Sequence, residues 1–325
     1  MDEPAASVTV SIVVPAFRAS RDIAGALTSI FDQTFTDFEV IVVNDGSPDT
    51  PELERAIAPF RSRIRYITQE NRGAGAARNV GIGAARGRYI AFLDADDLWM
   101  ADFLKRQMAF LDSDAGCDLV YCDAIISGET MLAGRRFMEM APSEGPVTLV
   151  SLLEQRCNVL LSTVVMRRRT LLDGGLFDET LRRGQDFDLW LRLAYRSARL
   201  AYQPVVLAER RARATGLSGS PVTEIERALN VLERFGRAHV LAVDARTALR
   251  VRSMALIDRL EIEQAKQRIV EGNFAAAKYH LAAPRQRTLK LWAALVALRV
   301  APRVMRRLYM MIAPDVTRTF RAASL

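Results

Sequence analysis

The sequence is poor in cysteine, and its three cysteines, Cys117, Cys122 and Cys157, are widely spaced. An odd number at this spacing provides neither a disulfide framework nor the paired pattern of a zinc site. We therefore expect a reducing, cytoplasmic setting. The sequence also lacks low-complexity tracts, internal repeats and a signal-peptide pattern at its N-terminus. These absences argue against a disordered, a solenoid and a secreted protein.

The charge of the chain is unevenly distributed along its 325 residues. That length accommodates one large domain and a smaller second one, and a hydrophobic fraction of 50% is ordinary for a globular protein. Residues 226–325 carry a net charge of +11, whereas residues 1–225 carry −4. A cationic C-terminal third suits anionic lipid, nucleic acid or an acidic partner. A solvated helical surface is the alternative.

Short apolar runs alternate with helical patterns in the first part of the chain. Such alternation implies βαβ units and an α/β fold, with a Rossmann-like, mostly parallel sheet flanked by helices. A buried strand is predicted at 160–166, an amphipathic helix at 186–194 and a further short apolar run at 202–208. The pattern becomes all-helical from residue 223. In the first part, strands are predicted at 8–14, 38–43, 64–68, 89–93 and 118–122, and helices at 21–33, 51–60, 75–85 and 101–113.

Polar or glycine-rich clusters follow the first four predicted strands. They are Pro15-Ala16-Phe17, Asn44–Ser47, Gln69–Gly75 and Asp94–Asp97. Ligands of open α/β sheets bind outside the carboxyl ends of the strands, so we expect the four clusters to meet at one rim. Each cluster alone is also compatible with a simple turn, because turns favour Gly, Asn and Asp.

Asp94 and Asp96 form the first chemical pattern. Alternate residues of an extended segment point to the same side, and paired carboxylates suit a hard cation such as Mg²⁺ or Mn²⁺. This pattern predicts a metal that holds a diphosphate. The alternative is a helix N-cap at Asp97.

Three further patterns have both a functional and a structural interpretation. Asp45 is placed to accept a hydrogen bond from a base or ribose, or to form a type I turn. The small residues of 71–79 allow close approach of a ligand and Arg78 adds a positive charge, or these residues only pack a helix on the sheet. Asp186, which follows Gln185 at a predicted helix start, fits a general base or an N-cap.

With these segments in order, the sequence resembles the family 2 glycosyltransferases of GT-A fold. The similarity is carried by residues 11–49, 71–99 and 174–194. It implies an inverting, metal-dependent enzyme that moves a sugar from a nucleotide-sugar, expected to be a UDP-sugar, to a hydroxyl in bacterial surface glycan biosynthesis. It also implies a GT-A domain at 1–222, with a nucleotide-sugar-binding half at about 1–125 and an acceptor half at 126–222. A helical region would occupy 223–325.

The resemblance also implies roles for the residues that match the family's motifs. Gln185 replaces the family's usual acidic residue before the base, and Arg213 stands near its usual histidine. The Gln-x-x-Arg-Trp motif of processive synthases is absent, which favours transfer of single sugars. The implied roles are a nucleoside pocket for Pro15, Ala16 and Phe17, base recognition for Asp45, contact with the nucleotide for Arg78 and Asp94, binding of Mn²⁺ or Mg²⁺ for Asp96 with Asp94, and the catalytic base for Asp186.

Residues 289–312 predict a basic amphipathic helix that Pro302 interrupts. Four arginines lie within ~100° of one another on a helical wheel, and most of the apolar residues lie on the other side. Such a helix is typical of membrane-surface binding and is too charged to span a bilayer. The alternative is packing on its own bundle or in a homodimer. The arginines are Arg299, Arg303, Arg306 and Arg307, and the apolar residues are Val300, Val304, Met305, Leu308, Met311 and Ile312.

The partners expected from this reasoning are a nucleotide-sugar donor and a glycan or lipid-linked acceptor, with no nucleic acid. Localisation would be cytoplasmic, with peripheral attachment to the inner face of the plasma membrane if the basic helix binds lipid. Two other functions stay open. A nucleotidyltransferase uses a similar fold and paired carboxylates, and a non-catalytic nucleotide-sugar-binding protein is compatible with Gln185.

Overall fold

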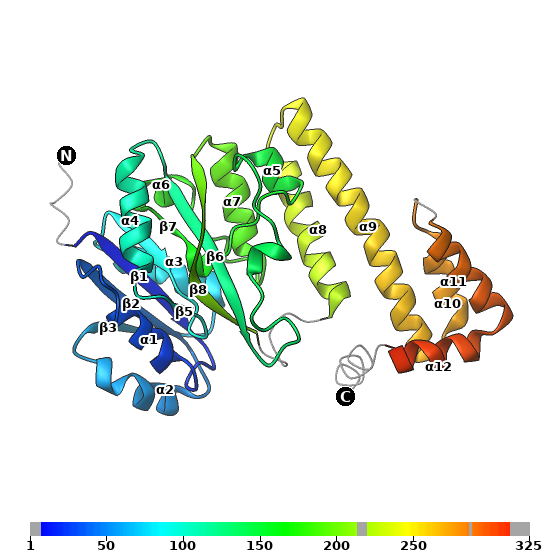
Figure 1. The fold of residues 1–325 in the computed structure, drawn as a ribbon, viewed down its shortest axis with the longest axis horizontal. Helices are drawn as coiled ribbons and strands as arrows, with labels where there is room; N and C mark the ends of the chain where they lie inside the picture. The colour runs from blue at the N-terminus through cyan, green and yellow to red at the C-terminus, as the bar shows by residue number, and fades with distance from the viewer. Residues whose placement is uncertain (1–7, 213–219, 286–287, 313–325) are drawn as a thin grey trace. The chain divides into compact units, whose positions relative to one another are not determined.

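The structure is a computed structural model that describes residues 8–212, 220–285 and 288–312. The chain divides into two compact units, Met1–Thr215 and Gly216–Leu325. In its described part, the first unit holds an eight-stranded sheet flanked by helices, and the second is helical (Figure 1). The α/β architecture with a C-terminal helical region confirms the predicted fold class.

Four parallel strands build the N-terminal half of the sheet in the order β3-β2-β1-β4. Apolar runs form these strands, and each ends at one of the polar clusters seen in the sequence. The strands are β1 Val10–Ala16, β2 Phe38–Asp45, β3 Ile64–Gln69 and β4 Tyr89–Phe92; they are connected by α1 Ile23–Phe31, α2 Thr50–Ile57 with the 3₁₀ turn Ala58–Phe60, and α3 Ala74–Ala84.

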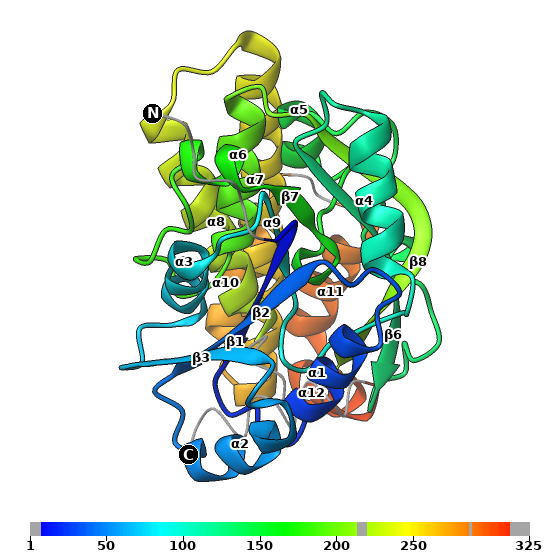
Figure 2. The ribbon, with the colours of Figure 1, turned by 90° about the vertical axis from the view of Figure 1, so that its left-hand side faces the viewer.

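Helices cover both faces of these strands (Figure 2). Ile12 and Val14 of β1 lie in a core shared with α1, α2 and the later helix α4, Phe103–Ser113. Val13 points to the opposite face, towards α3. A Cβ added to Gly81 of α3 would lie 2.4 Å from Val13 Cγ1. The glycine thus lets α3 pack closely on the sheet, as the small residues of this segment predict.

The second half of the sheet departs from parallel order. Strand β7 pairs antiparallel with both β4 and β6, whereas β6 and β8 are parallel, and β5 pairs antiparallel with β8. The strands are β5 Leu98–Trp99, β6 Leu119–Gly128, β7 Val165–Arg167 and β8 Leu200–Ala212; the other elements are α5 Leu149–Leu153, α6 Arg168–Asp173, α7 Gln185–Tyr195 and the 3₁₀ turns Phe137–Glu139 and Leu161–Thr163.

The strand predicted at 160–166 is only partly correct. Its first half is the 3₁₀ turn Leu161–Thr163, and β7 begins at Val165. Side chains, not a neighbouring strand, bind the carbonyls of this turn. Trp99 Nε1 donates to the Ser162 carbonyl and Gln107 Nε2 to the Thr163 carbonyl, both at 2.7 Å. Long-range contacts therefore override the apolar run.

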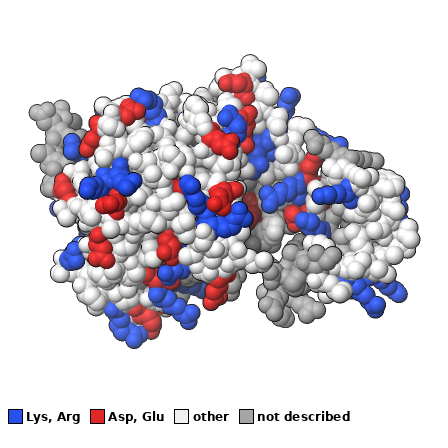
Figure 3. Space-filling model, viewed as in Figure 1, with Lys and Arg blue, Asp and Glu red and all other residues white. Residues whose placement is uncertain are grey.

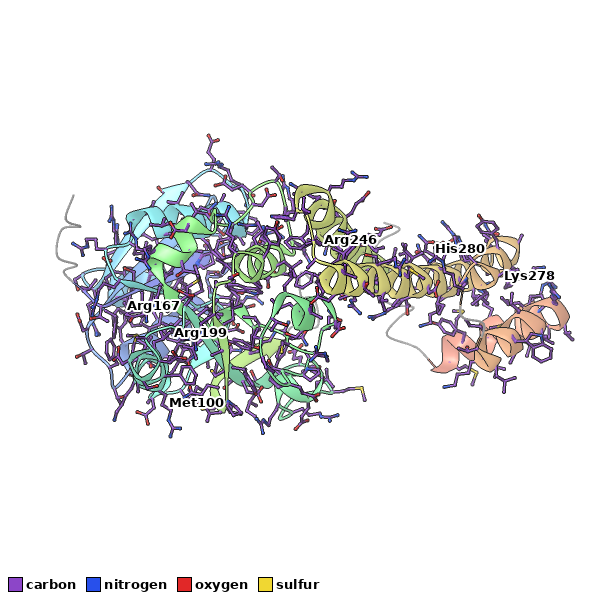
Figure 4. All side chains as sticks on the ribbon, turned by 90° about the horizontal axis from the view of Figure 1, so that it is seen from above. Met100, Arg167, Arg199, Arg246, Lys278 and His280 are labelled. Carbon is purple, nitrogen blue, oxygen red and sulfur yellow. The ribbon has the colours of Figure 1, made fainter. Side chains whose placement is uncertain are left out.

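The second unit consists of helices that pack in sequence. Helix α8 packs against α9. Helix α10 carries His280 (Figure 4). It is joined to α9 because His280 Nδ1 lies 2.8 Å from Glu261 Oε2. A small core of α9, α10 and α11 side chains includes Ile269, Leu281 and Leu298. The helices are α8 Pro221–Ala238, α9 Val243–Glu271, α10 Phe274–Ala282, α11 Leu289–Val300 and α12 Pro302–Ile312.

The predicted wheel that placed four arginines on one helix face is wrong. Helix α11 ends at Val300, Ala301 has φ −142°, and α12 begins at Pro302. Proline has no N–H to donate and disfavours the helical conformation of the residue before it. Arg299 therefore belongs to a different helix from Arg303. Within the described ranges, none of the helices is both long and apolar enough to span a bilayer.

Candidate active site

Asp45 lies at the end of β2, where its buried carboxylate organises the neighbouring loop. Asp45 Oδ1 accepts hydrogen bonds from Gln69 Nε2 at 2.7 Å and from the backbone N–H of Arg72 at 2.9 Å. Asp45 Oδ2 accepts one from the backbone N–H of Gly73 at 2.8 Å. A carboxylate has about four acceptor sites. Asp45 thus holds β2, β3 and the entry to α3 together and keeps capacity for one further donor.

The Pro15-Ala16-Phe17 cluster lies beside the loop that follows β2. The backbone N–H of Arg18 donates to Ser47 Oγ at 2.6 Å, which joins the two clusters. Ala16 is buried, whereas Phe17 is 38% exposed and has the Arg18 guanidinium 5.5 Å from its ring centroid. The sheet therefore presents an aromatic ring and a cation at its rim, next to Asp45.

Arg78 and Asp94 form the central ion pair of the site. Arg78, from α3, is buried, and its Nη2 lies 2.6 Å from Asp94 Oδ1 after β4. The guanidinium also lies 5.5 Å from the ring centroid of Phe177. Arg78 Nε is buried without a hydrogen-bond partner in the described structure. This pair joins the segment 71–79 to the loop after β4, two segments that are separate in the sequence.

The loop Asp94–Asp97 is held by Ser162, a buried residue of the 3₁₀ turn Leu161–Thr163. The Ser162 hydroxyl donates to Asp97 Oδ2 at 2.6 Å and accepts from the backbone N–H of Asp94 at 3.2 Å. Asp97 Oδ1 accepts from the backbone N–H of Arg211 at 3.0 Å. Burial, with the charges of Asp94 and Asp96, raises the pKa of Asp97 to about 7. Asp97 precedes a strand, so the N-cap alternative for it is wrong.

Asp186 lies in the first turn of α7 and is half-buried. Desolvation raises its pKa, the positive charge of Arg78 lowers it, and the negative charge of Asp94 raises it. Asp186 is therefore within electrostatic reach of the central ion pair. The N-cap alternative is wrong here too, because Gly184 occupies that position and Asp186 Oδ1 accepts from its neighbour, the backbone N–H of Phe187, at 2.8 Å.

Gln185, which replaces an acidic residue of the resemblance, has a packing role. Its side chain is buried, and its Nε2 donates to the Leu181 carbonyl at 2.6 Å. A Cβ added to Gly75 of α3 would lie 3.2 Å from Gln185 Nε2. The start of α7 thus packs directly on the first turn of α3, and this contact brings the segment that carries Asp186 next to the helix that carries Arg78.

Two supporting residues were missed by the sequence analysis. Asn79 donates to the Phe177 carbonyl at 2.9 Å and accepts from the Phe177 backbone N–H at 3.0 Å, which fastens the loop before α7 to α3. Ser162 is the second. Neither belongs to a pattern of charge or spacing, although the position of Asn79 directly after Arg78 was a weak signal.

The carboxylates of this loop fit a divalent metal whose remaining ligands come from a bound substrate. Asp94 is 38% exposed, and its Oδ1 is engaged by Arg78. No group of three or more His, Cys, Asp or Glu side chains suited to a metal ion occurs among the described residues. Mg²⁺ is commonly held by one or two carboxylates together with phosphate oxygens. Arg213, which the sequence placed near the family's histidine, lies outside the described residues.

Comparisons with known proteins identify the family of this chain. Residues 11–167 match the family model Glycosyl transferase family 2. An Escherichia coli protein, UDP-Glc:alpha-D-GlcNAc-diphosphoundecaprenol beta-1,3-glucosyltransferase WfgD, is 32% identical over 185 residues, which cover 57% of this chain and 69% of that protein. An uncharacterized glycosyltransferase of Rickettsia felis is 32% identical over 200 residues, which cover 58% of this chain. The chain spans only 31% of the length of that protein.

Two solved structures share the fold. The mannosyltransferase PcManGT from Pyrobaculum calidifontis, in complex with GDP-Man and Mn²⁺, has a TM-score of 0.63 at 19% identity, over 100% of this chain and 88% of that chain. S. aureus TarS 1-349 in complex with UDP-GlcNAc has a TM-score of 0.58 at 19% identity, over 96% and 89%. Both likenesses concern the GT-A fold. The match to the family model and the similarity to the E. coli enzyme show that this chain is a glycosyltransferase and belongs to glycosyl transferase family 2.

Proposed function

We propose that this chain is an inverting, metal-dependent glycosyltransferase that transfers one sugar from a UDP-sugar to a hydroxyl of a lipid-linked glycan acceptor. One observation carries the proposal. The buried Arg78, paired with Asp94 at 2.6 Å, lies within electrostatic reach of Asp186, which comes from a different part of the chain. A cation for a diphosphate and a carboxylate of raised pKa for a proton thus lie close together.

In the proposed reaction, the acceptor hydroxyl attacks the anomeric carbon while the bond to the diphosphate breaks. The hydroxyl proton passes to Asp186, and the bonding electron pair leaves with the nucleoside diphosphate. Arg78 and Asp94 orient the nucleotide, and Phe17 and Asp45 line its base. Asp96, with Asp94, would hold Mn²⁺ or Mg²⁺, which when bound neutralises charge on the leaving diphosphate.

The choice of donor and acceptor rests on relatives. The E. coli relative is named for UDP-Glc and a diphosphoundecaprenol-linked acceptor, and the TarS structure holds UDP-GlcNAc. These names support a UDP-sugar, a lipid-linked acceptor and a place in bacterial surface glycan biosynthesis. We assign nucleotide-sugar binding to residues 1–125 and acceptor binding to 126–222. A lipid-linked acceptor would also bring the enzyme to the inner face of the plasma membrane.

A panel of nucleotide-sugars tests the proposal. The full chain is incubated with UDP-Glc, UDP-GlcNAc, UDP-Gal or GDP-Man, Mn²⁺ and a lipid-diphosphate-linked sugar, and the released nucleotide is identified. We expect UDP release that depends on both the metal and the acceptor. Pyrophosphate release would favour a nucleotidyltransferase, and tight UDP-sugar binding without release from any mixture would favour a non-catalytic binding protein.

A further inference from the structure

Helix α11 carries only two charged residues, Lys290 and Arg299, and is otherwise apolar. Its buried side contributes Leu298, with Leu291 and Leu295 packed against the small core of the second unit. Its other side is also apolar, with Leu289, Trp292 and Val300 all more than half exposed. A helix that is apolar on both its inner and its outer side is normally covered on both. Its outer side therefore requires a covering partner.

Helix α12 continues the same arrangement beyond the break at Ala301. Met305 and Tyr309 pack on the core of the unit. Val304, Leu308 and Met311 form a stripe at helical spacing, and each is more than half exposed. We call the outer apolar side chains of both helices, together with the exposed Arg299, Arg303 and Arg307, the α11–α12 surface.

The charge of this surface has one sign. Residues 288–312 contain no Asp or Glu, and Lys290, Arg299, Arg303 and Arg307 are exposed. Arg306, by contrast, is half-buried and donates to the Val270 carbonyl at 3.0 Å, so it anchors α12 to α9. On the face shown in Figure 3, the end of the second unit that holds α11 and α12 is largely uncharged, with basic side chains at its margin.

We propose that the α11–α12 surface binds an anionic lipid bilayer. Leu308, Met311 and Trp292 would enter the boundary between headgroups and acyl chains, and the exposed arginines would contact lipid phosphates. A second copy is the less favourable occupant. In a two-fold interface the same patches meet, so basic segments without a carboxylate would face each other.

This inference rests on the α11–α12 surface alone and not on the proposed chemistry. Its test therefore needs no donor and no acceptor. If it fails, the nucleotide-sugar panel still decides the transferase activity, and if that panel fails, vesicle binding still stands. Where both hold, docking would bring a lipid-linked acceptor and the enzyme to the same surface.

Trp292 provides the readout. It is 62% exposed, whereas the other two tryptophans, Trp99 and Trp190, are buried. The full chain is titrated with vesicles of phosphatidylglycerol and phosphatidylcholine, or of phosphatidylcholine alone, and fluorescence is followed together with co-sedimentation. We expect a blue shift and co-sedimentation with the anionic vesicles, a much weaker response with the neutral ones, and weakening by salt, because exposed charges are screened over about 10 Å at 0.1 M.

Charge reversal locates the surface. Arg303→Glu with Arg307→Glu should weaken binding to anionic vesicles by ~10-fold or more, since each basic residue near the surface contributes to lipid attraction. The matched control reverses two exposed arginines of α9, Arg250→Glu with Arg259→Glu, and should retain most of the binding. Circular dichroism verifies that both variants keep their helices. Leu308→Ser should reduce the blue shift without a change in net charge.

Four results would overturn the proposal. The first is no response of the full chain to anionic vesicles at low salt, and the second is an equal response to neutral ones. The third is an equal loss of binding in the α9 control. The fourth is a dimer that ignores vesicles and that Leu308→Ser converts to a monomer, which would make a second copy the occupant of this surface.

Discussion

Ser162 joins the two ends of the acidic loop, because its hydroxyl donates to Asp97 Oδ2 and accepts from the Asp94 backbone N–H. The same residue's carbonyl accepts from Trp99 Nε1 at 2.7 Å. The loop that carries the proposed metal ligand is therefore held by a side chain from a separate 3₁₀ turn. These contacts restrict the conformation of the loop, as a preorganised site requires.

Ser162→Ala removes both side-chain hydrogen bonds and leaves the buried Asp97 carboxylate poorly satisfied. We expect a loss of about 1–3 kcal/mol in the free energy of unfolding, together with weaker Mn²⁺-dependent UDP binding. Denaturant unfolding and calorimetry measure the two effects. Ser113→Ala, at an exposed site near the end of α4, should change neither. Unchanged UDP binding by a folded Ser162→Ala protein would exclude the positioning role.

Asp96→Ala should abolish transfer while the fold survives, because a half-exposed residue after β4 contributes little to the core. A bound metal contributes several kcal/mol to stabilisation of the transition state, so loss of its proposed ligand should lower turnover by ~100-fold or more. EDTA should inhibit the protein without the substitution, and Mn²⁺ or Mg²⁺ should restore its activity. Asp112→Ala, exposed on α4, is the control. Full turnover of Asp96→Ala in EDTA would contradict the metal hypothesis.

Asp186→Asn should lower turnover by about 10²-fold or more, as loss of a general base does, with UDP affinity retained. Asp188 provides a matched control two residues along the same helix. Its carboxylate is bound by Arg192 Nε at 2.8 Å, so Asp188→Asn should lower thermal stability more than turnover. If instead Asp188→Asn loses turnover and Asp186→Asn does not, the base has been assigned to the wrong residue.

The pH dependence of turnover follows from the raised pKa of Asp186, which burial causes. The base accepts a proton only when deprotonated, so turnover should rise with pH as the carboxyl ionises. The acid limb of the profile should lie above the ordinary aspartate pKa of 3.8, and the Asp186→Asn protein should lack it. A profile that is identical in both proteins would assign the limb to another group.

Substitution of two glycines of α3 by alanine should change the stability of the fold in opposite directions. Gly81→Ala places a methyl group against Val13 and should destabilise the fold by about 1–3 kcal/mol through overpacking. Gly83 is exposed, and no described atom lies within 4 Å of an added Cβ. Gly83→Ala should therefore stabilise the helix by up to about 1 kcal/mol. Denaturant midpoints of the two variants compare them directly, and equal midpoints would contradict the close packing of α3 on β1.

The sequence predicts those features of this protein that neighbouring residues in the chain determine. Carboxylates directly after an apolar run locate Asp94 and Asp96, and the start of a helical pattern locates Asp186. Ser162 and Asn79 are not predictable in this way, because each acts on a segment distant in the sequence. Pro302 indicated the helix break at Ala301. A helical wheel drawn across this proline is wrong, because it places side chains of two separate helices around a single axis.

The contact between Gly75 and Gln185 restricts how this enzyme can diverge. A β-carbon at position 75 would lie 3.2 Å from Gln185 Nε2 and 3.3 Å from its Cδ. A side chain larger than that of alanine at 75 thus requires the buried Gln185 side chain to move, or a shorter residue to replace it. The two substitutions have a preferred order, and the reverse order passes through a strained intermediate. Directed evolution of donor preference through the first turn of α3 should therefore recover changes at 185 first.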